Sequence, residues 1–204
     1  MPEFECQAMV EVFESIVDGL MEQGYALSTD FLPQELVAKI QSQSIAKKNA
    51  GAFRAAGIGK GAEFAQVESI RRDEILWIEN ETLDPVERAF LDHVSQFIHY
   101  LNRTCYTGLR EAEFHYACYA PGSFYKRHLD RFRGDDARRY SVVCYFNPNW
   151  QPGDGGELVI YAGEEAITVQ PKAGTVVIFE SRKLEHEVLL SHKDRYSLTG
   201  WLKG

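Results

Sequence analysis

Apolar residues recur at helical spacing through the first hundred residues of the chain. Residues 10–21 predict a helix that Gly24 can end, and a second helix is expected to begin at Pro33. A third should begin at Asp84, whose side chain can cap the helix while Pro85 suits its first turn. Two short strands are also expected, at residues 25–27 and 75–78.

Residues 47–64 break this pattern because they are rich in Ala, Gly and Lys and have no hydrophobic period. An irregular segment of this length in a compact domain is commonly a functional lid, although a solvated connector is the alternative. We expect it to be mobile. A phosphate-binding loop is excluded, since Lys60 is followed by Gly61 where that motif requires Ser or Thr.

From residue 113 the pattern changes to short β-rich runs separated by turns that contain Gly and Pro. The runs are residues 114–120, 140–146, 157–162, 166–170, 175–180, 186–190 and 196–202. So many short strands favour a jelly roll. The expected class is α+β, a double-stranded β-helix with supporting N-terminal helices. Residues 1–204 would form a single domain, with residues 1–112 mainly as helical support and mobile loop and 113–204 as the jelly-roll core.

Net charge, hydropathy and cysteine content indicate which binding partners and which cellular compartment to expect. The formal net charge of -8 and the pI near 5.3 disfavour nucleic acids and membrane surfaces, which attract basic patches. No apolar run approaches the ~18 residues of a membrane span, and the acidic N-terminus is unlike a signal peptide. The four cysteines form no CxxC pair, which indicates free thiols and neither disulfides nor structural zinc. We expect a cytoplasmic protein.

Three residues suggest a metal site. His128 and Asp130 are separated by one residue at the end of the run 124–128, so that both would point to one face of a strand. His186, 56 residues after Asp130, begins another run and could complete a set of two imidazoles and one carboxylate, a facial triad typical of Fe(II). Taken alone, a His-x-Asp pattern is more often a surface turn or a structural histidine than a metal site.

Arg195 adds a second signal. It shares one predicted strand face with Ser197, Thr199 and Trp201, so its guanidinium would lie inside an otherwise apolar layer. A buried guanidinium needs an anion, and its planar fork suits a carboxylate. The carboxylate could belong to a ligand or to an internal Asp or Glu.

The chain from Gly24 onward resembles the prolyl hydroxylase domain family of Fe(II)/2-oxoglutarate-dependent dioxygenases, which includes the hypoxia-inducible factor prolyl hydroxylases and bacterial relatives. The family pattern is HxD, then H, then R nine residues later, as in His128, Asp130, His186 and Arg195. Further similar blocks, in one order, are YALSTDFL, IRRDEILWIE, ACYAPGSFYKRHLD, YFNPNW, GGEL and RYSLTGW.

The resemblance implies roles for individual residues. It implies iron ligands at His128, Asp130 and His186, with Arg195 binding the distal carboxylate of 2-oxoglutarate. It places Tyr145 and Thr199 beside that carboxylate and Tyr119 and Tyr125 in the pocket, although core packing is the alternative for each tyrosine. Arg138 and Trp201 match the substrate mouth, and Arg71, Asp73 and Trp77 match the end of a flexible loop that covers substrate.

The implied reaction is hydroxylation, with Fe(II), 2-oxoglutarate and O2 as cofactors and ascorbate as reductant. The retained carboxylate at Asp130 argues against the related halogenases, which lack it. The implied substrate is a prolyl residue in an exposed loop of a protein, and translation elongation factor Tu is the first candidate. Free proline or another small molecule is the alternative substrate, and a non-catalytic metal- or ligand-binding sensor is the alternative function.

Two other enzyme classes fit less well. Nucleic-acid demethylases with this triad carry a second arginine six residues after the first, where this chain has Trp201. A zinc hydrolase built on His186 and Glu187 would need the helical HExxH spacing, but the next histidine is His192.

Overall fold

In a computed structural model, which describes residues 3–57, 67–130 and 137–204, the chain forms helices on one side of two facing β-sheets. The helices are α1 (Glu3–Gln23), α2 (Gln34–Asn49) and α3 (Pro85–Cys105). The strands are β1 (Tyr25–Ser28), β2 (Arg54–Ala55), β3 (Glu74–Trp77), β4 (Glu111–Tyr119), β5 (Tyr125–His128), β6 (Arg138–Tyr145), β7 (Leu158–Ala162), β8 (Glu165–Val169), β9 (Val176–Glu180), β10 (Glu185–Val188) and β11 (Arg195–Lys203).

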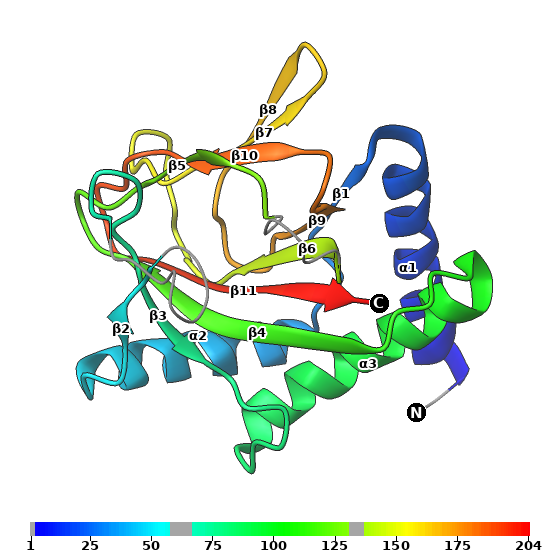
Figure 1. Ribbon diagram of the computed structural model, residues 1–204. Coiled ribbons are helices and arrows are strands. Elements are labelled where there is room, and N and C mark those ends of the chain that lie inside the picture. Colours follow the sequence, from blue (N-terminus) through cyan, green and yellow to red (C-terminus); the bar gives the residue numbers. More distant parts are fainter. Residues whose placement is uncertain (1–2, 58–66, 131–136) are drawn as a thin grey trace.

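The two sheets have the interleaved strand orders of a jelly roll. The larger sheet has the order β1-β9-β6-β11-β4-β3-β2, and the smaller has the order β5-β10-β7-β8. All the pairings within them are antiparallel. Figure 1 shows the smaller sheet on the side of the larger sheet that faces away from the helices. The predicted α+β class and double-stranded β-helix are confirmed.

Alternation along the strands divides the buried residues into two cores. On β4, Phe114, Tyr116 and Cys118 pack with the helices in one cluster, whereas Ala117 and Tyr119 pack in a second cluster between the sheets. The second cluster is the floor of the space in which the candidate site lies.

The predicted helix boundaries follow from local chemistry. Gly24 directly follows α1 with a φ of 79°, a backbone conformation that favours glycine. Pro33 is the N-cap of α2. The Asp84 side chain caps α3 by accepting from the backbone N–H of Val86 and of Glu87, at 2.9 and 3.1 Å. These predictions are confirmed.

The prediction of an irregular segment at residues 47–64 is wrong at two places. Helix α2 continues to Asn49, and Arg54–Ala55 forms strand β2 against β3. The last turn of α2 is held by ion pairs to other elements, Lys47 with Glu87 at 3.1 Å and Lys48 with Glu74, which hydrophobic periodicity does not detect. Residues 58–66, on which the predicted mobility also falls, lie outside the described residues.

One further detail differs from expectation. Asp130 does not lie on the strand with His128, because β5 ends at His128 itself. In the described part of the chain, none of the helices is long and apolar enough to cross a membrane.

Candidate metal centre and its cavity

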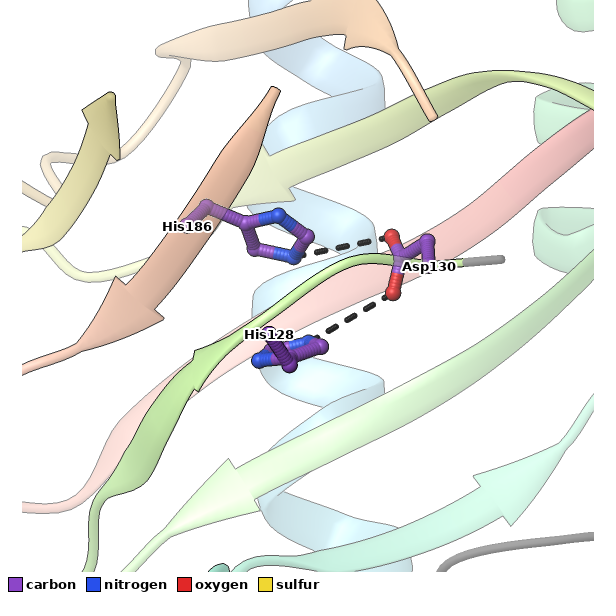
Figure 2. Close-up of side chains that lie close together, drawn as sticks. All are labelled: His128, Asp130 and His186. Carbon is purple, nitrogen blue, oxygen red and sulfur yellow. Dashed lines mark ion pairs between the residues drawn. The ribbon is translucent and has the colours of Figure 1, made fainter. Parts of the chain in front are cut away.

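His128, Asp130 and His186 meet between the two sheets. His128 ends β5 and is paired with His186 on the neighbouring β10, so that their rings lie 4.3 Å apart between centroids. The chain turns after β5 and brings the Asp130 carboxylate up to both rings (Figure 2). Its Oδ1 lies 3.5 Å from His128 Nε2, and its Oδ2 lies 3.6 Å from His186 Nε2. The potential ligand atoms all lie within 4.8 Å of one another.

Backbone contacts determine which nitrogen each histidine offers. His128 Nδ1 lies 2.7 Å from the carbonyl oxygen of Lys126, and His186 Nδ1 lies 3.3 Å from that of Leu184. A carbonyl oxygen can only accept, so each Nδ1 carries the proton and donates it. Both Nε2 atoms therefore present a lone pair toward Asp130, as metal-ligating imidazoles do.

The protonation states also suit a metal. Burial lowers the pKa of His186 to about 4, so the ring is neutral at pH 7. The Ser141 hydroxyl donates to the Asp130 carboxylate at 2.7 Å, which favours the ionised form of that side chain. Two imidazoles and one carboxylate form the donor set of a non-haem Fe(II) site, and this triad fits it.

A cavity of about 620 Å³ contains the triad. Its walls include all but one of the other residues predicted for cosubstrate or substrate: Arg71, Asp73, Trp77, Tyr119, Tyr125, Arg138, Arg195, Thr199 and Trp201. The exception is Tyr145, which lies behind Arg195 and contacts it. The structure therefore brings together side chains that are up to 130 positions apart in the sequence, from Arg71 to Trp201.

Arg195 is a buried cation with few partners. It is 1% exposed, and its Nη2 donates to the Tyr145 hydroxyl at 3.2 Å. Its guanidinium carbon lies 4.7 Å from the ring centroid of Tyr119 and 4.8 Å from that of Tyr145. Its Nε has no hydrogen-bond partner, and none of the described acidic side chains forms an ion pair with it. The internal ion pair considered above is thus absent from the described residues, and the site fits the carboxylate of a ligand.

Gly156 has no side chain, and this leaves room for the side chain of Arg195. Its φ is +67°, and a Cβ built at this position would lie 2.9 Å from Arg195 Cδ. The GGEL turn therefore needs glycine here for both its backbone conformation and this close approach.

Two arginines of the cavity wall contact its aromatic side chains. Arg71 donates to both carboxylate oxygens of Asp73, at 2.7 and 2.5 Å, and lies 4.3 Å from the centroid of the Tyr125 ring. Tyr125 in turn stacks on the imidazole ring of His128, with centroids 3.6 Å apart. These contacts link the segment before β3 to the metal site.

The second arginine, Arg138, donates to Glu113 Oε1 at 2.7 and 3.0 Å and lies 3.4 Å from the centroid of a Trp201 ring. The indole of Trp201 is therefore held between strands. Trp77, which is 49% exposed, lies 6.3 Å from Trp201 between ring centroids and extends this aromatic wall to the surface.

Sequence reasoning missed His115, Glu113 and Ser141. His115 is buried in the cavity wall, 4.8 Å from Trp77 and 5.6 Å from Trp201 between ring centroids, and its Nδ1 has no partner. Burial lowers the pKa of His115 to about 4. The alternation of the run 114–120 places His115 on the face of Ala117 and Tyr119, and that signal could have identified it.

Comparisons with known proteins agree with this site. The model of the 2OG-Fe(II) oxygenase superfamily matches residues 114–203, and this is the class that the fold and the triad define. A prolyl-4-hydroxylase from Pseudomonas putida is 36% identical with a TM-score of 0.84, and the match covers 94% of this chain and 98% of that one. The chain therefore belongs to the prolyl hydroxylase family within this superfamily, as the sequence resemblance predicted.

Two other solved structures extend the comparison. A prolyl hydroxylase from Trichoplax adhaerens, in complex with a peptide fragment of the hypoxia-inducible factor oxygen degradation domain, is 25% identical with a TM-score of 0.84, covering 100% of this chain and 94% of that one. A Phytophthora capsici prolyl 4-hydroxylase shares the fold at 22% identity and a TM-score of 0.78, covering 97% of this chain and 65% of that one.

Proposed function

We propose that this oxygenase hydroxylates a prolyl residue in a protein substrate and releases succinate and CO2, with the whole chain acting as one catalytic domain. The observation that carries the proposal is the buried Arg195, a cation without a described acidic partner in the same cavity as a two-histidine, one-carboxylate cluster. A dicarboxylate that reached both would satisfy Arg195 at one end and leave its other end beside the metal ligands.

The residues divide the work of binding. His128 and His186 would hold Fe(II) through Nε2, with Asp130 as the carboxylate ligand. Arg195 would bind the far carboxylate of 2-oxoglutarate. Because Tyr145 accepts from Arg195, its own O–H can donate to the same carboxylate. When bound, Fe(II), 2-oxoglutarate and O2 supply the oxidation of an unactivated C–H bond.

Other cavity residues would position the reactants and exclude water. We propose that Thr199 and Tyr119 flank the cosubstrate, since both line the cavity and Tyr119 packs on Arg195. Tyr125 covers one face of His128 and is itself covered by Arg71, so these side chains would limit the access of water from this side of the proposed metal site.

The substrate would enter along the aromatic wall. Trp77 and Trp201 offer flat apolar surfaces that suit a pyrrolidine ring, and Arg138 offers a cation beside them. Arg71 and Asp73, at the end of the loop that precedes β3, would lie over the bound chain. The Trichoplax neighbour, solved with a peptide, supports a polypeptide substrate. Elongation factor Tu is the first candidate, which implies a cytoplasmic location.

The test is turnover with defined substrates. We expect the protein, given Fe(II), ascorbate and 2-oxoglutarate under air, to form succinate, and to do so faster with a proline-containing target such as elongation factor Tu. Peptide mapping should then locate a +16 Da adduct on a proline. Conversion of free proline without any protein adduct would refute the protein substrate. Metal binding without any succinate would favour a sensor.

A further inference from the structure

We propose that Ser141 and Ser181 form a hydroxyl relay that fixes the carboxylate of Asp130 for metal binding, which makes both serines positioning residues. Ser141 lies on β6 and Ser181 directly follows β9, and both side chains are 0% exposed. Ser141 Oγ donates to Asp130 Oδ2 at 2.7 Å, and the two serine oxygens lie 2.8 Å apart.

Counting protons gives the relay a direction. A carboxylate that binds a metal is ionised and can only accept, so the hydrogen bond to Asp130 uses the single proton of the Ser141 hydroxyl. Ser141 must therefore accept from Ser181. The order is Ser181 O–H to Ser141, then Ser141 O–H to Asp130, and each bond polarises the next.

The relay selects one carboxylate oxygen. With Oδ2 held by Ser141, Oδ1 is the atom of Asp130 that has no described hydroxyl donor, and it lies on the side of His128. Oδ2 also lies 3.6 Å from His186 Nε2, so Ser141 uses part of the accepting capacity of Oδ2 and leaves that of Oδ1 intact.

Asp130 needs such support because it lies beyond the end of β5, whereas both histidines lie on paired strands. The support comes from the opposite sheet. Ser141 is within the pairing of β6 with β9 and β11, and the backbone N–H of Ser181 donates to the carbonyl oxygen of Arg139 at 3.1 Å. Both hydroxyls are therefore held in place by backbone pairing and not by the metal.

This inference rests on the proposed metal site, and the experiment separates the two. The metal-free protein is titrated anaerobically with Mn(II) by calorimetry, and the visible spectrum of bound Co(II) reports on ligand geometry. Ser141→Ala should bind Mn(II) about 10- to 100-fold more weakly, the usual effect of losing a hydrogen bond to a ligand. Ser141→Thr keeps the hydroxyl on a residue that strands accept, so it should restore most of the affinity.

Ser44→Ala is the matched control. Ser44 is also buried and donates to the carbonyl oxygen of Ile40 at 2.7 Å, but it lies in α2, away from the cavity. Its loss should leave Mn(II) affinity and the Co(II) spectrum unchanged, whatever its effect on the melting temperature. Ser181→Ala should lower affinity in the same direction as Ser141→Ala but by less, since the direct bond to Asp130 remains.

The outcomes are distinct. If the unaltered protein and its His186→Ala variant bind Mn(II) equally, the proposed metal site is wrong. If the unaltered protein binds and the two serine-to-alanine variants bind equally well, the relay is wrong while the site stands. If Ser141→Ala does not fold, the other two variants still decide. Unchanged affinity in Ser181→Ala would overturn the proposal, and so would a loss of 10-fold or more in Ser141→Thr, which is the effect expected when a hydrogen bond to a metal ligand is lost.

Discussion

Replacing Arg195 with methionine should weaken the binding of 2-oxoglutarate without lowering the stability of the protein that has no cosubstrate bound. Arg195 is 1% exposed, and its Nε has no hydrogen-bond partner. The contacts described for its guanidinium are all with uncharged groups, namely the Tyr145 hydroxyl and the rings of Tyr119 and Tyr145. A buried charge without an anion opposes folding, whereas an unbranched apolar side chain of similar length fills the same space. We therefore expect Arg195→Met to be at least as stable as the original protein when no cosubstrate is present.

The same change should weaken the binding of 2-oxoglutarate. Hydrogen bonds to charged groups contribute about 1.5–3 kcal/mol, which corresponds to about 10- to 100-fold in Kd. At a concentration 100 times the original Kd, 2-oxoglutarate should stabilise the original protein by about 2.7 kcal/mol. With a Kd 100-fold higher, the same concentration would stabilise the variant by only about 0.4 kcal/mol.

Urea unfolding of the Mn(II)-loaded protein, with and without 2-oxoglutarate, measures the free energy of unfolding and the stabilisation by 2-oxoglutarate without turnover. Arg88→Met is the control, because Arg88 is an exposed arginine on α3 that donates to the carbonyl oxygen of Thr82. An unchanged Kd in Arg195→Met would show that the cosubstrate binds elsewhere. A loss of several kcal/mol without cosubstrate would show that the guanidinium is a structural partner within the fold.

Four other substitutions test three separate parts of the molecule. His128→Ala and His186→Ala should each abolish metal binding by calorimetry while circular dichroism stays unchanged, since the jelly roll is held by packing; full affinity in either would remove that histidine from the site. Asp84→Ala should lower stability by about 1 kcal/mol through loss of the α3 cap without altering succinate formation. His115→Phe tests a pH effect. Because the pKa of His115 falls from 6.5 to about 4 on folding, this residue should lower the free energy of unfolding by up to about 3 kcal/mol as the pH falls from 6.5 to 4. Urea unfolding at pH 7 and pH 4 should therefore show a smaller loss of stability in the variant than in the original protein. An equal loss in both would contradict the lowered pKa of His115.

The elements that the sequence predicted correctly are those with a local cause. Caps such as Asp84, the stop at Gly24 and the alternating runs after residue 113 depend on residues near one another in the chain. The triad was predictable because the HxD spacing and the later His and Arg recur in a known family. Arg195 also followed from simple chemistry, since a guanidinium on an apolar strand face requires an anion.

The features that were missed depend on distant pairs. The last turn of α2 forms because Lys47 and Lys48 meet acidic residues of α3 and β3. Ser141 is an ordinary polar residue in the run 140–146, and only the pairing of β6 with β9 brings Ser181 to it from 40 positions away. No periodicity in one stretch of sequence contains that information.

The candidate site lies between two sheets of unequal size, so its geometry depends on contacts between residues that are far apart in the sequence. The helices pack on the larger sheet, whose strands β11 and β6 carry Arg195 and Ser141. The two histidines lie on the smaller sheet, which the helices do not cover. Asp130 follows β5 of the smaller sheet but accepts from Ser141 of the larger one, so a metal bound by all three residues would link the two sheets. Because Arg195 lies on the same sheet as Ser141, a shift of the smaller sheet would move both histidines relative to Arg195 and to the hydroxyl that contacts Asp130.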